Sequence, residues 1–210
     1  MRHFLFSTDK QMKNTVIFDL FQVLIDWQPD PFYTSVISDK NRLAYFLNEV
    51  MHKDFGLFTD GVPVLKPVLS LLKEKHPDFS KELDMYIDNE YKMINVIDGT
   101  VDIAKELKSK GIKLYMLSNI SIESVPWLKS EPFFPLFDGA ILSGEIDVAK
   151  PDPRIFQYLF DKYNVRPEDA VFIDDRLENT KAAEEAGLSS ILFTNPENLK
   201  KELTRYNLLP

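Results

Sequence analysis

Four groups of polar side chains each follow a short apolar segment, and their types are those that phosphoryl transfer needs. In chain order they are Asp19, Ser118-Asn119, Lys150 and Asp174-Asp175. A carboxylate can attack phosphorus, and a magnesium ion can bind between carboxylates. A lysine and a hydroxyl can hold phosphate oxygens. These roles require the fold to bring the four groups together, although they lie far apart in the sequence.

The segments that carry these groups predict the elements that position them. Short apolar runs predict buried strands over residues 15–20, 112–118, 139–142, 170–174 and 189–193. The spacing of apolar residues predicts helices over residues 101–110, 153–163, 178–186 and 196–206. This alternation predicts an α/β fold of three layers, with helices on both faces of a five-stranded parallel sheet. Because ligands bind beyond the carboxyl ends of such strands, we expect the four polar groups at one edge.

A second region interrupts this alternation between the first and second strands. Its pattern predicts helices over residues 40–53, 64–75 and 80–91, with no convincing strand. We therefore expect a core domain built from residues 12–26 and 98–210, and a helical insertion over residues 27–97. Residues 1–11 are interpreted as an optional N-terminal extension.

The composition excludes several classes of protein. Of the 210 residues, 44% are hydrophobic, which is typical of a folded domain, and the net charge is −8. An acidic chain has no excess of basic side chains to neutralise nucleic-acid phosphates. The chain has no cysteine, which excludes disulfides, a thiol nucleophile and thiolate metal sites. No apolar run approaches the roughly 20 residues of a membrane helix. We expect a cytoplasmic monomer or weak dimer that binds neither nucleic acid nor membrane.

Four motifs in order carry a resemblance to a known family. They are FDLFQVL at 18–24, LSN at 117–119, KPDPRIF at 150–156 and FIDDRLENTKAAEEAG at 172–187. With them the chain resembles the haloacid dehalogenase-like (HAD) hydrolase superfamily, in its phosphatase-like branch, and is similar to sugar-1-phosphate phosphatases. The resemblance implies a Rossmann-like core with an inserted helical cap. It also implies Mg²⁺-dependent hydrolysis of a small phosphorylated metabolite through an aspartyl-phosphate.

The resemblance assigns roles to individual residues of this chain. Asp19 would be the nucleophile, and Lys150 would stabilise it and the developing charge. Ser118 and Asn119 would bind phosphate, and Asn179 would orient the acidic pair. The Mg²⁺ ligands would be Asp19, the main-chain carbonyl of Phe21, Asp175, and Asp174 either directly or through water.

One position departs from the family pattern. Phosphatases of this family carry a second aspartate two residues after the nucleophile, as general acid and base. Here that position is Phe21, followed by Gln22, and the resemblance implies that both would contact the substrate. General acid–base catalysis contributes about 10²–10⁴-fold, so alkyl phosphates should turn over slowly. Anomeric and acyl phosphates, which have good leaving groups, should suffer least. Asp26 is a distant candidate for a replacement acid.

Phe21 leaves two alternatives open. Haloacid dehalogenases have an aromatic residue at this position and need no metal, but they lack the acidic pair seen at Asp174-Asp175. That pair would place unbalanced negative charge beside Asp19 unless a cation bound there. A catalytically impaired binding protein is the other alternative.

The remaining residues that could do chemistry are interpreted more simply. His3, His52 and His76 match no metal-binding pattern, and we expect all three at the surface. Trp27 is interpreted as a packing residue, with a place in the substrate pocket as the alternative.

Overall fold

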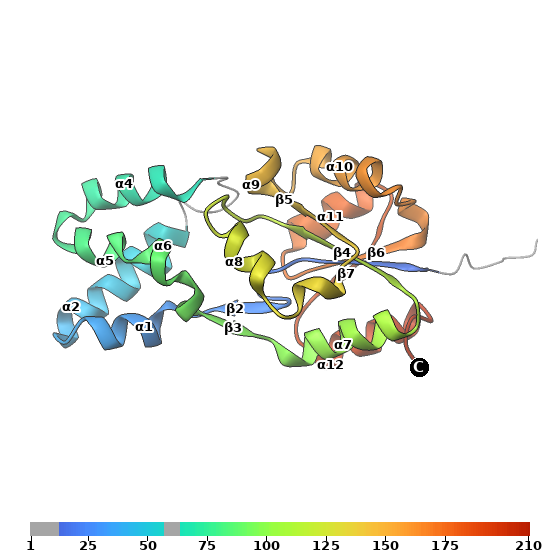
Figure 1. The fold of residues 1–210 in the computed structure, drawn as a ribbon, viewed down its shortest axis with the longest axis horizontal. Helices are drawn as coiled ribbons and strands as arrows, with labels where there is room; N and C mark the ends of the chain where they lie inside the picture. The colour runs from blue at the N-terminus through green and yellow to red at the C-terminus, as the bar shows by residue number, and fades with distance from the viewer. Residues whose placement is uncertain (1–12, 57–63) are drawn as a thin grey trace, which may run out of the picture.

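The computed structural model, which describes residues 13–56 and 64–210, contains a parallel sheet of five strands (Figure 1). In spatial order the strands are β5 (Gly139–Leu142), β4 (Lys113–Ser118), β1 (Thr15–Phe18), β6 (Ala170–Asp174) and β7 (Ser189–Leu192). The predicted three-layer α/β fold with five parallel strands is confirmed. The predicted extension over residues 1–11 lies outside the described residues.

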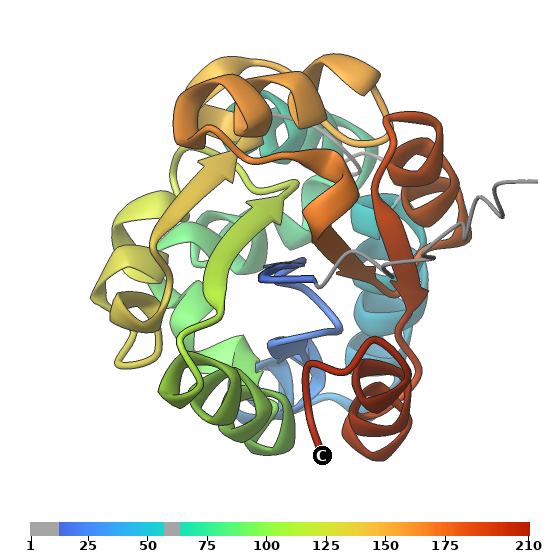
Figure 2. The same ribbon diagram turned by 90° about the vertical axis from the view of Figure 1, so that its right-hand side faces the viewer.

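Alternate residues of the central strand point to opposite faces of the sheet, and each face is covered by helices. Val16 and Phe18 pack in one cluster with α7 (Asp98–Ser109) and α12 (Pro196–Arg205). Ile17 packs in another cluster with α10 (Pro153–Tyr163) and α11 (Leu177–Glu185). Figure 2 shows α7 and α12 together on one side of the sheet.

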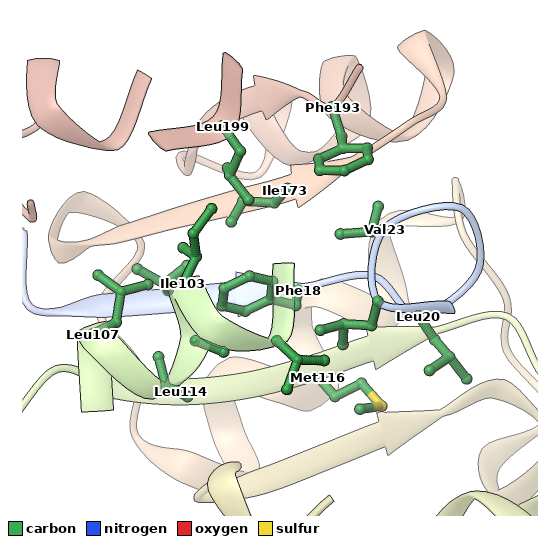
Figure 3. Packing of buried hydrophobic residues seen from close by; sticks show 14 of the residues in the cluster. Phe18, Leu20, Val23, Ile103, Leu107, Leu114, Met116, Ile173, Phe193 and Leu199 are labelled. Atoms are coloured by element: carbon green, nitrogen blue, oxygen red, sulfur yellow. The ribbon is translucent and has the colours of Figure 1, made fainter. Parts of the chain in front are cut away.

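The first of these clusters also fixes the segment that follows Asp19. Leu20 and Val23 are fully buried and pack against β4 and β6 residues such as Met116 and Ile173 (Figure 3). Full burial of one such aliphatic side chain stabilises the fold by about 1.5–3 kcal/mol. The chain beyond β1 is therefore held by packing on both sides of Phe21.

All the predicted core elements are present with ends within three residues of the expected ones, and short elements complete the connections. The strands β5 and β6 and the helix α10 begin and end where the sequence predicts, while α7 begins three residues earlier. The connecting elements are α8 (Val125–Ser130), η4 (Phe134–Leu136), α9 (Ser143–Ile146) and η5 (Pro167–Asp169). No helix in the described part of the chain is long and apolar enough to span a membrane.

The helical insertion has a hydrophobic cluster of its own, which includes Tyr33, Phe46 and Leu72. The first two predicted helices are present, with residues 40–55 forming one continuous helical segment, but the predicted helix over 80–91 is divided into short pieces. The elements are α1 (Pro29–Val36), α2 (Lys40–Tyr45), η1 (Phe46–Phe55), α4 (Leu65–Lys75), η2 (Pro77–Phe79), α5 (Ser80–Asp84), α6 (Tyr86–Asn89) and η3 (Glu90–Met93).

A short strand pair joins the insertion to the sheet domain, which corrects the expectation that residues 27–97 hold no strand. The strands β2 (Ile25–Trp27) and β3 (Ile94–Val96) are antiparallel and lie where the chain enters and leaves the insertion (Figure 1). Three residues are too few to show an alternating pattern, and the pairing depends on main-chain contacts. It is extended by hydrogen bonds from Gln28 N to Met93 O (2.6 Å) and from Ile97 N to Leu24 O (2.9 Å).

One histidine is not where the sequence predicts. His76 is buried, and its Nε2 lies 2.6 Å from Oδ2 of the buried Asp54. A buried carboxylate requires polar partners, and His76 supplies one of them inside the insertion. His52 is exposed, as expected.

Candidate active site

Three carboxylates meet at the carboxyl ends of the two central strands. Asp19 follows β1 directly, Asp174 is the last residue of β6, and Asp175 is the next residue along the chain. Each offers an oxygen, and these oxygens all lie within 4.8 Å of one another. The neighbouring parallel strands β1 and β6 produce this arrangement, because they end at the same edge of the sheet.

Lys150 connects two of these carboxylates. Its Nζ lies 2.6 Å from Oδ1 of Asp19 and 2.7 Å from Oδ2 of Asp174, and its side chain is 1% exposed. Asn119 holds the main chain of Lys150 on both sides. Its Oδ1 accepts from Lys150 N at 2.7 Å, and its Nδ2 donates to Lys150 O at 2.9 Å. Asn119 therefore positions the lysine as well as lining the site.

Asp174 is held rigidly below the surface of the site. Its Oδ1 accepts from the main-chain N of Arg176 at 2.8 Å. The Nδ2 of Asn179 lies 3.0 Å from Oδ1 and 3.1 Å from Oδ2. Asn179 thus orients Asp174, the first residue of the acidic pair. Asp174 is fully buried, whereas Asp175 is half-buried.

The charges at this edge do not balance. Three carboxylates face one buried lysine, and Arg176, which also lines the cavity, is itself paired with Glu178. Burial raises the pKa of Asp19 to about 7, with Lys150 acting against this shift and Asp174 adding to it. Burial also raises the pKa of Asp175, and Asp174 acts in the same direction. For Lys150, burial lowers the pKa, but the two carboxylates outweigh it and the pKa is raised. The charge count and the all-oxygen donor set both fit a hard divalent cation such as Mg²⁺.

A cavity of about 480 Å³ opens between the carboxylate cluster and the helical insertion. Residues from the sheet domain and from the insertion both line it. They are Asp19, Phe21, Gln22, Trp27, Phe55, Gly56, Leu65, Tyr86, Glu90, Asn119, Ile120, Ser121, Ser124, Lys150, Asp175, Arg176 and Asn179. A cavity of this size suits a small molecule rather than a polymer.

Most of the predicted site residues are brought together here, but three are not in the cavity wall. Ser118 and Asp174 are fully buried and are absent from the described lining residues. The Ser118 hydroxyl lies 3.5 Å from the main-chain oxygen of Asn119, a long contact. Asp26 is also absent from that lining, and its Oδ1 accepts from Gln22 Nε2 at 3.1 Å. This placement does not support Asp26 as a replacement acid.

Sequence reasoning missed the polar residues of the opposite wall. Tyr86 and Glu90 come from short helical pieces of the insertion, which carry no motif. Ser121 and Ser124 lie two and five residues after Asn119, so the serines that follow this motif were the available signal. Trp27 does both things considered for it, since it stacks on a neighbouring ring and also lines the cavity.

The loop after β4, which carries these serines, is held in place by the residues at the end of β5. The Ser143 hydroxyl accepts from Ile120 N at 2.9 Å and donates to Ile120 O at 3.0 Å. Gly144 N also donates to Ile120 O, at 2.9 Å. A Cβ added to Gly144 would lie 2.4 Å from the main-chain N of Ile122. The loop therefore packs on Gly144 without room for a side chain.

We expect Gly144→Ala to destabilise the protein by about 1–3 kcal/mol, because the added methyl meets main-chain atoms that cannot rotate away. Urea unfolding measures this change. Gly56→Ala is the matched control, since a Cβ there has no described atom within 4 Å. Equal stability of Gly144→Ala and the wild type would show that the loop is not fixed by this contact.

The chain belongs to the haloacid dehalogenase-like hydrolases, because the model of that family matches residues 13–187. The site just described lies within the matched residues. This family membership confirms the resemblance to the haloacid dehalogenase-like hydrolases that the four motifs carry.

Curated relatives of this chain have different activities. Drimenol cyclase from Aspergillus calidoustus is 25% identical over 204 residues, which are 92% of this chain but only 36% of that protein. The phosphorylated carbohydrates phosphatase of Thermotoga maritima is 25% identical, over 84% of this chain and 82% of that protein. (S)-2-haloacid dehalogenase 4A of Burkholderia cepacia is 24% identical, over 78% of this chain and 71% of that protein. The chain thus spans about a third of the length of the first of these relatives.

Solved structures share the fold. The magnesium complex of a HAD family enzyme from Bacteroides thetaiotaomicron has a TM-score of 0.66 and 21% sequence identity. The match covers 92% of this chain and 98% of that chain. At this level of identity the likeness establishes the architecture alone.

Proposed function

We propose that the protein is a Mg²⁺-dependent phosphatase that hydrolyses a small phosphomonoester through an aspartyl-phosphate on Asp19. One observation carries this proposal: three carboxylates and one buried lysine converge beside a cavity between the sheet domain and the insertion. An acidic cluster with excess negative charge has no use in an attack on carbon, whereas it suits a cation-assisted attack on phosphorus. The Thermotoga phosphatase supports the same chemistry.

The residues of this chain have separate tasks in the proposed reaction. Lys150 holds one oxygen of Asp19, which fixes the direction of the carboxylate. A carboxylate oxygen of Asp19 forms a bond to phosphorus while the bond to the leaving oxygen breaks. Water then attacks the phosphorus of the aspartyl-phosphate, its bond to Asp19 breaks, and inorganic phosphate is released.

Asp19, Asp175, the main-chain carbonyl of Phe21 and, directly or through water, Asp174 would hold the Mg²⁺ ion. When bound, Mg²⁺ offsets the negative charge of the carboxylates and of the phosphoryl oxygens. The Bacteroides enzyme of the same fold was solved as a magnesium complex, which supports magnesium as the ion. Asn119 and the lysine would bind the phosphoryl group on the other side, and the insertion would act as a cap that limits the entry of water.

Phe21 determines which substrates react fast. It lines the cavity and is half-buried, so a phenyl ring occupies the place from which an acid would protonate the leaving oxygen. A leaving group that is stable as an anion needs no such proton. We therefore propose that acyl or anomeric phosphates turn over faster than alkyl phosphates.

Hydrolysis of p-nitrophenyl phosphate and acetyl phosphate tests the proposal. Their leaving groups, p-nitrophenolate and acetate, depart without a proton, so neither reaction needs the acid that is missing at Phe21. We expect turnover with Mg²⁺, loss of turnover with EDTA, and recovery when excess Mg²⁺ is restored. Absence of phosphate release from both compounds in saturating Mg²⁺ would exclude this function.

A metal-independent 2-haloacid dehalogenase is the second candidate, favoured by the aromatic ring of Phe21 and by the Burkholderia relative. It predicts release of halide from a 2-haloacid in the presence of EDTA. The unbalanced acidic cluster is the reason we rank it second. A catalytically impaired binding protein would give neither phosphate nor halide release.

The setting of the reaction is also a proposal. The 480 Å³ cavity favours a small phosphorylated metabolite over nucleic acid or a membrane surface as partner. A monomer or weak dimer that works in the cytoplasm stays a prediction, which sedimentation of the purified protein and fractionation of cells would check.

A further inference from the structure

A second polar cluster lines the same cavity. Within the described residues it makes no hydrogen bond to the carboxylates of Asp19, Asp174 and Asp175. The Nε1 of Trp27 donates to the hydroxyl of Tyr86 at 3.0 Å, and the side chain of Tyr86 is hydrogen-bonded to Glu90. The hydroxyl of Ser124 donates to Oε2 of Glu90 at 2.5 Å, and Ser121 bonds to Ser124 at 2.9 Å. All five residues line the cavity.

The direction of the protons in this network follows from the chemistry of its members. An indole N–H can only donate, so the Tyr86 oxygen accepts from Trp27 and its own proton is left for Glu90. Ser124 also donates to Glu90. Both protein partners of the Glu90 carboxylate are therefore donors, and both stabilise its charged form.

Glu90 keeps acceptor capacity for a ligand. An ionised carboxylate has about four acceptor positions, and Ser124 and Tyr86 use two of them. Glu90 is only 6% exposed, yet it lines the cavity, so its remaining positions are accessible to a molecule bound there rather than to bulk solvent. Burial raises the pKa of Glu90, and the hydrogen bonds from Ser124 and Tyr86 oppose this.

The rest of this wall is apolar. Trp27 stacks on Phe55 with ring centroids 5.5 Å apart and an interplanar angle of 10°. Leu65 and Ile120 line the cavity as well. A wholly apolar leaving group would remove water from Glu90 without replacing its hydrogen bonds, which is costly. A leaving group with hydroxyl groups and a C–H face would satisfy both parts of the wall.

We propose that Glu90 determines substrate specificity by accepting a hydrogen bond from a hydroxyl of the leaving group, so that the substrate is a phosphorylated polyol or sugar. The proposal rests on the phosphatase function proposed above. It places recognition of the leaving group on the insertion and attack on phosphorus on the sheet domain. Ser124 belongs to the sheet domain, so its bond to Glu90 joins the two halves of the site.

Competitive inhibition of p-nitrophenyl phosphate hydrolysis tests this without requiring the slow turnover of alkyl phosphates. The probes are erythritol 4-phosphate and n-butyl phosphate, which have the same carbon chain and differ in their hydroxyl groups. We expect the wild type to bind the polyol phosphate at least about tenfold more tightly, the gain from one charge-assisted hydrogen bond.

Glu90→Gln should remove most of this preference. The amide has one acceptor oxygen where the carboxylate has two, so the donors Ser124 and Tyr86 leave it little acceptor capacity for a substrate hydroxyl. The preference is a ratio within each variant, so a general loss of activity cancels. Glu74→Gln is the matched control. It makes the same chemical change on the exposed surface of α4, and this variant should retain the preference for the polyol phosphate.

Two results would overturn the inference, and they are distinguishable from failure of the phosphatase proposal. Equal inhibition of the wild type by both probes would exclude recognition of hydroxyl groups, even if Glu90→Gln did not fold. A preference that survives in a folded Glu90→Gln variant would exclude Glu90 as its source. No hydrolysis of either p-nitrophenyl phosphate or acetyl phosphate by the wild type in saturating Mg²⁺ would overturn the phosphatase function itself, and this inference with it.

Discussion

Asp19→Asn should reduce hydrolysis of p-nitrophenyl phosphate at least about 10⁴-fold, because an amide cannot form the bond to phosphorus. The fold should persist. The main-chain N of Asp19 still donates to Ile173 O, at 2.9 Å, and Lys150 keeps its contact with Asp174. Initial rates in Mg²⁺ measure the loss, and thermal unfolding followed by circular dichroism confirms the fold.

A matched control separates the nucleophile from general damage to the acidic cluster. Asp26→Asn makes the same change in a residue outside the described lining of the cavity, and it should retain activity within about threefold. If Asp19→Asn retained a substantial part of the wild-type rate, Asp19 would not be the nucleophile.

Phe21→Asp should raise turnover of alkyl phosphates by about 10²–10⁴-fold, the usual contribution of a general acid. Phe21 lines the cavity next to Asp19, so an aspartate there can reach the leaving oxygen. Hydrolysis of p-nitrophenyl phosphate should change far less, since p-nitrophenolate leaves without a proton. The measurement compares kcat/KM for n-butyl phosphate and p-nitrophenyl phosphate in both proteins.

Phe21→Asn is the control for this gain, because it has the size of aspartate but cannot donate an acidic proton. It should leave the ratio between the two substrates near that of the wild type. An equal gain in both variants would mean that relief of steric crowding, rather than acid catalysis, is responsible. No gain in Phe21→Asp would show that the surroundings, such as Gln22 or the insertion, have also changed.

The sheet domain could be predicted from sequence because its elements have strong local signals. The β6 run Ala170–Asp174 is apolar up to its last residue and fully buried, and the α10 run Pro153–Tyr163 has helical spacing after an aspartate cap. The antiparallel pair β2 and β3 had no such signal. Its three-residue strands are half-buried or exposed for most of their length, and they are stabilised by pairing across the chain.

The site residues also divide into those that could be predicted from the sequence and those that could not. Asp19, Lys150 and Asp175 lie at strand ends or in motif loops, where topology alone brings them together. Glu90 and Tyr86 depend on how the insertion folds against the sheet domain, and no local pattern encodes that contact. The expectation for His76 failed for the same reason, since its partner Asp54 lies 22 positions away in the sequence.

Mass spectrometry of the peptide that contains Asp19, after acid quenching during turnover of acetyl phosphate with Mg²⁺, tests the central claim most directly. Acid slows hydrolysis of an acyl phosphate enough to retain it. The account predicts a phosphoryl group on Asp19, absent from Asp19→Asn and from samples with EDTA. Rapid release of phosphate with the phosphoryl group on another residue, or with no phosphorylated protein at any time point, would contradict it.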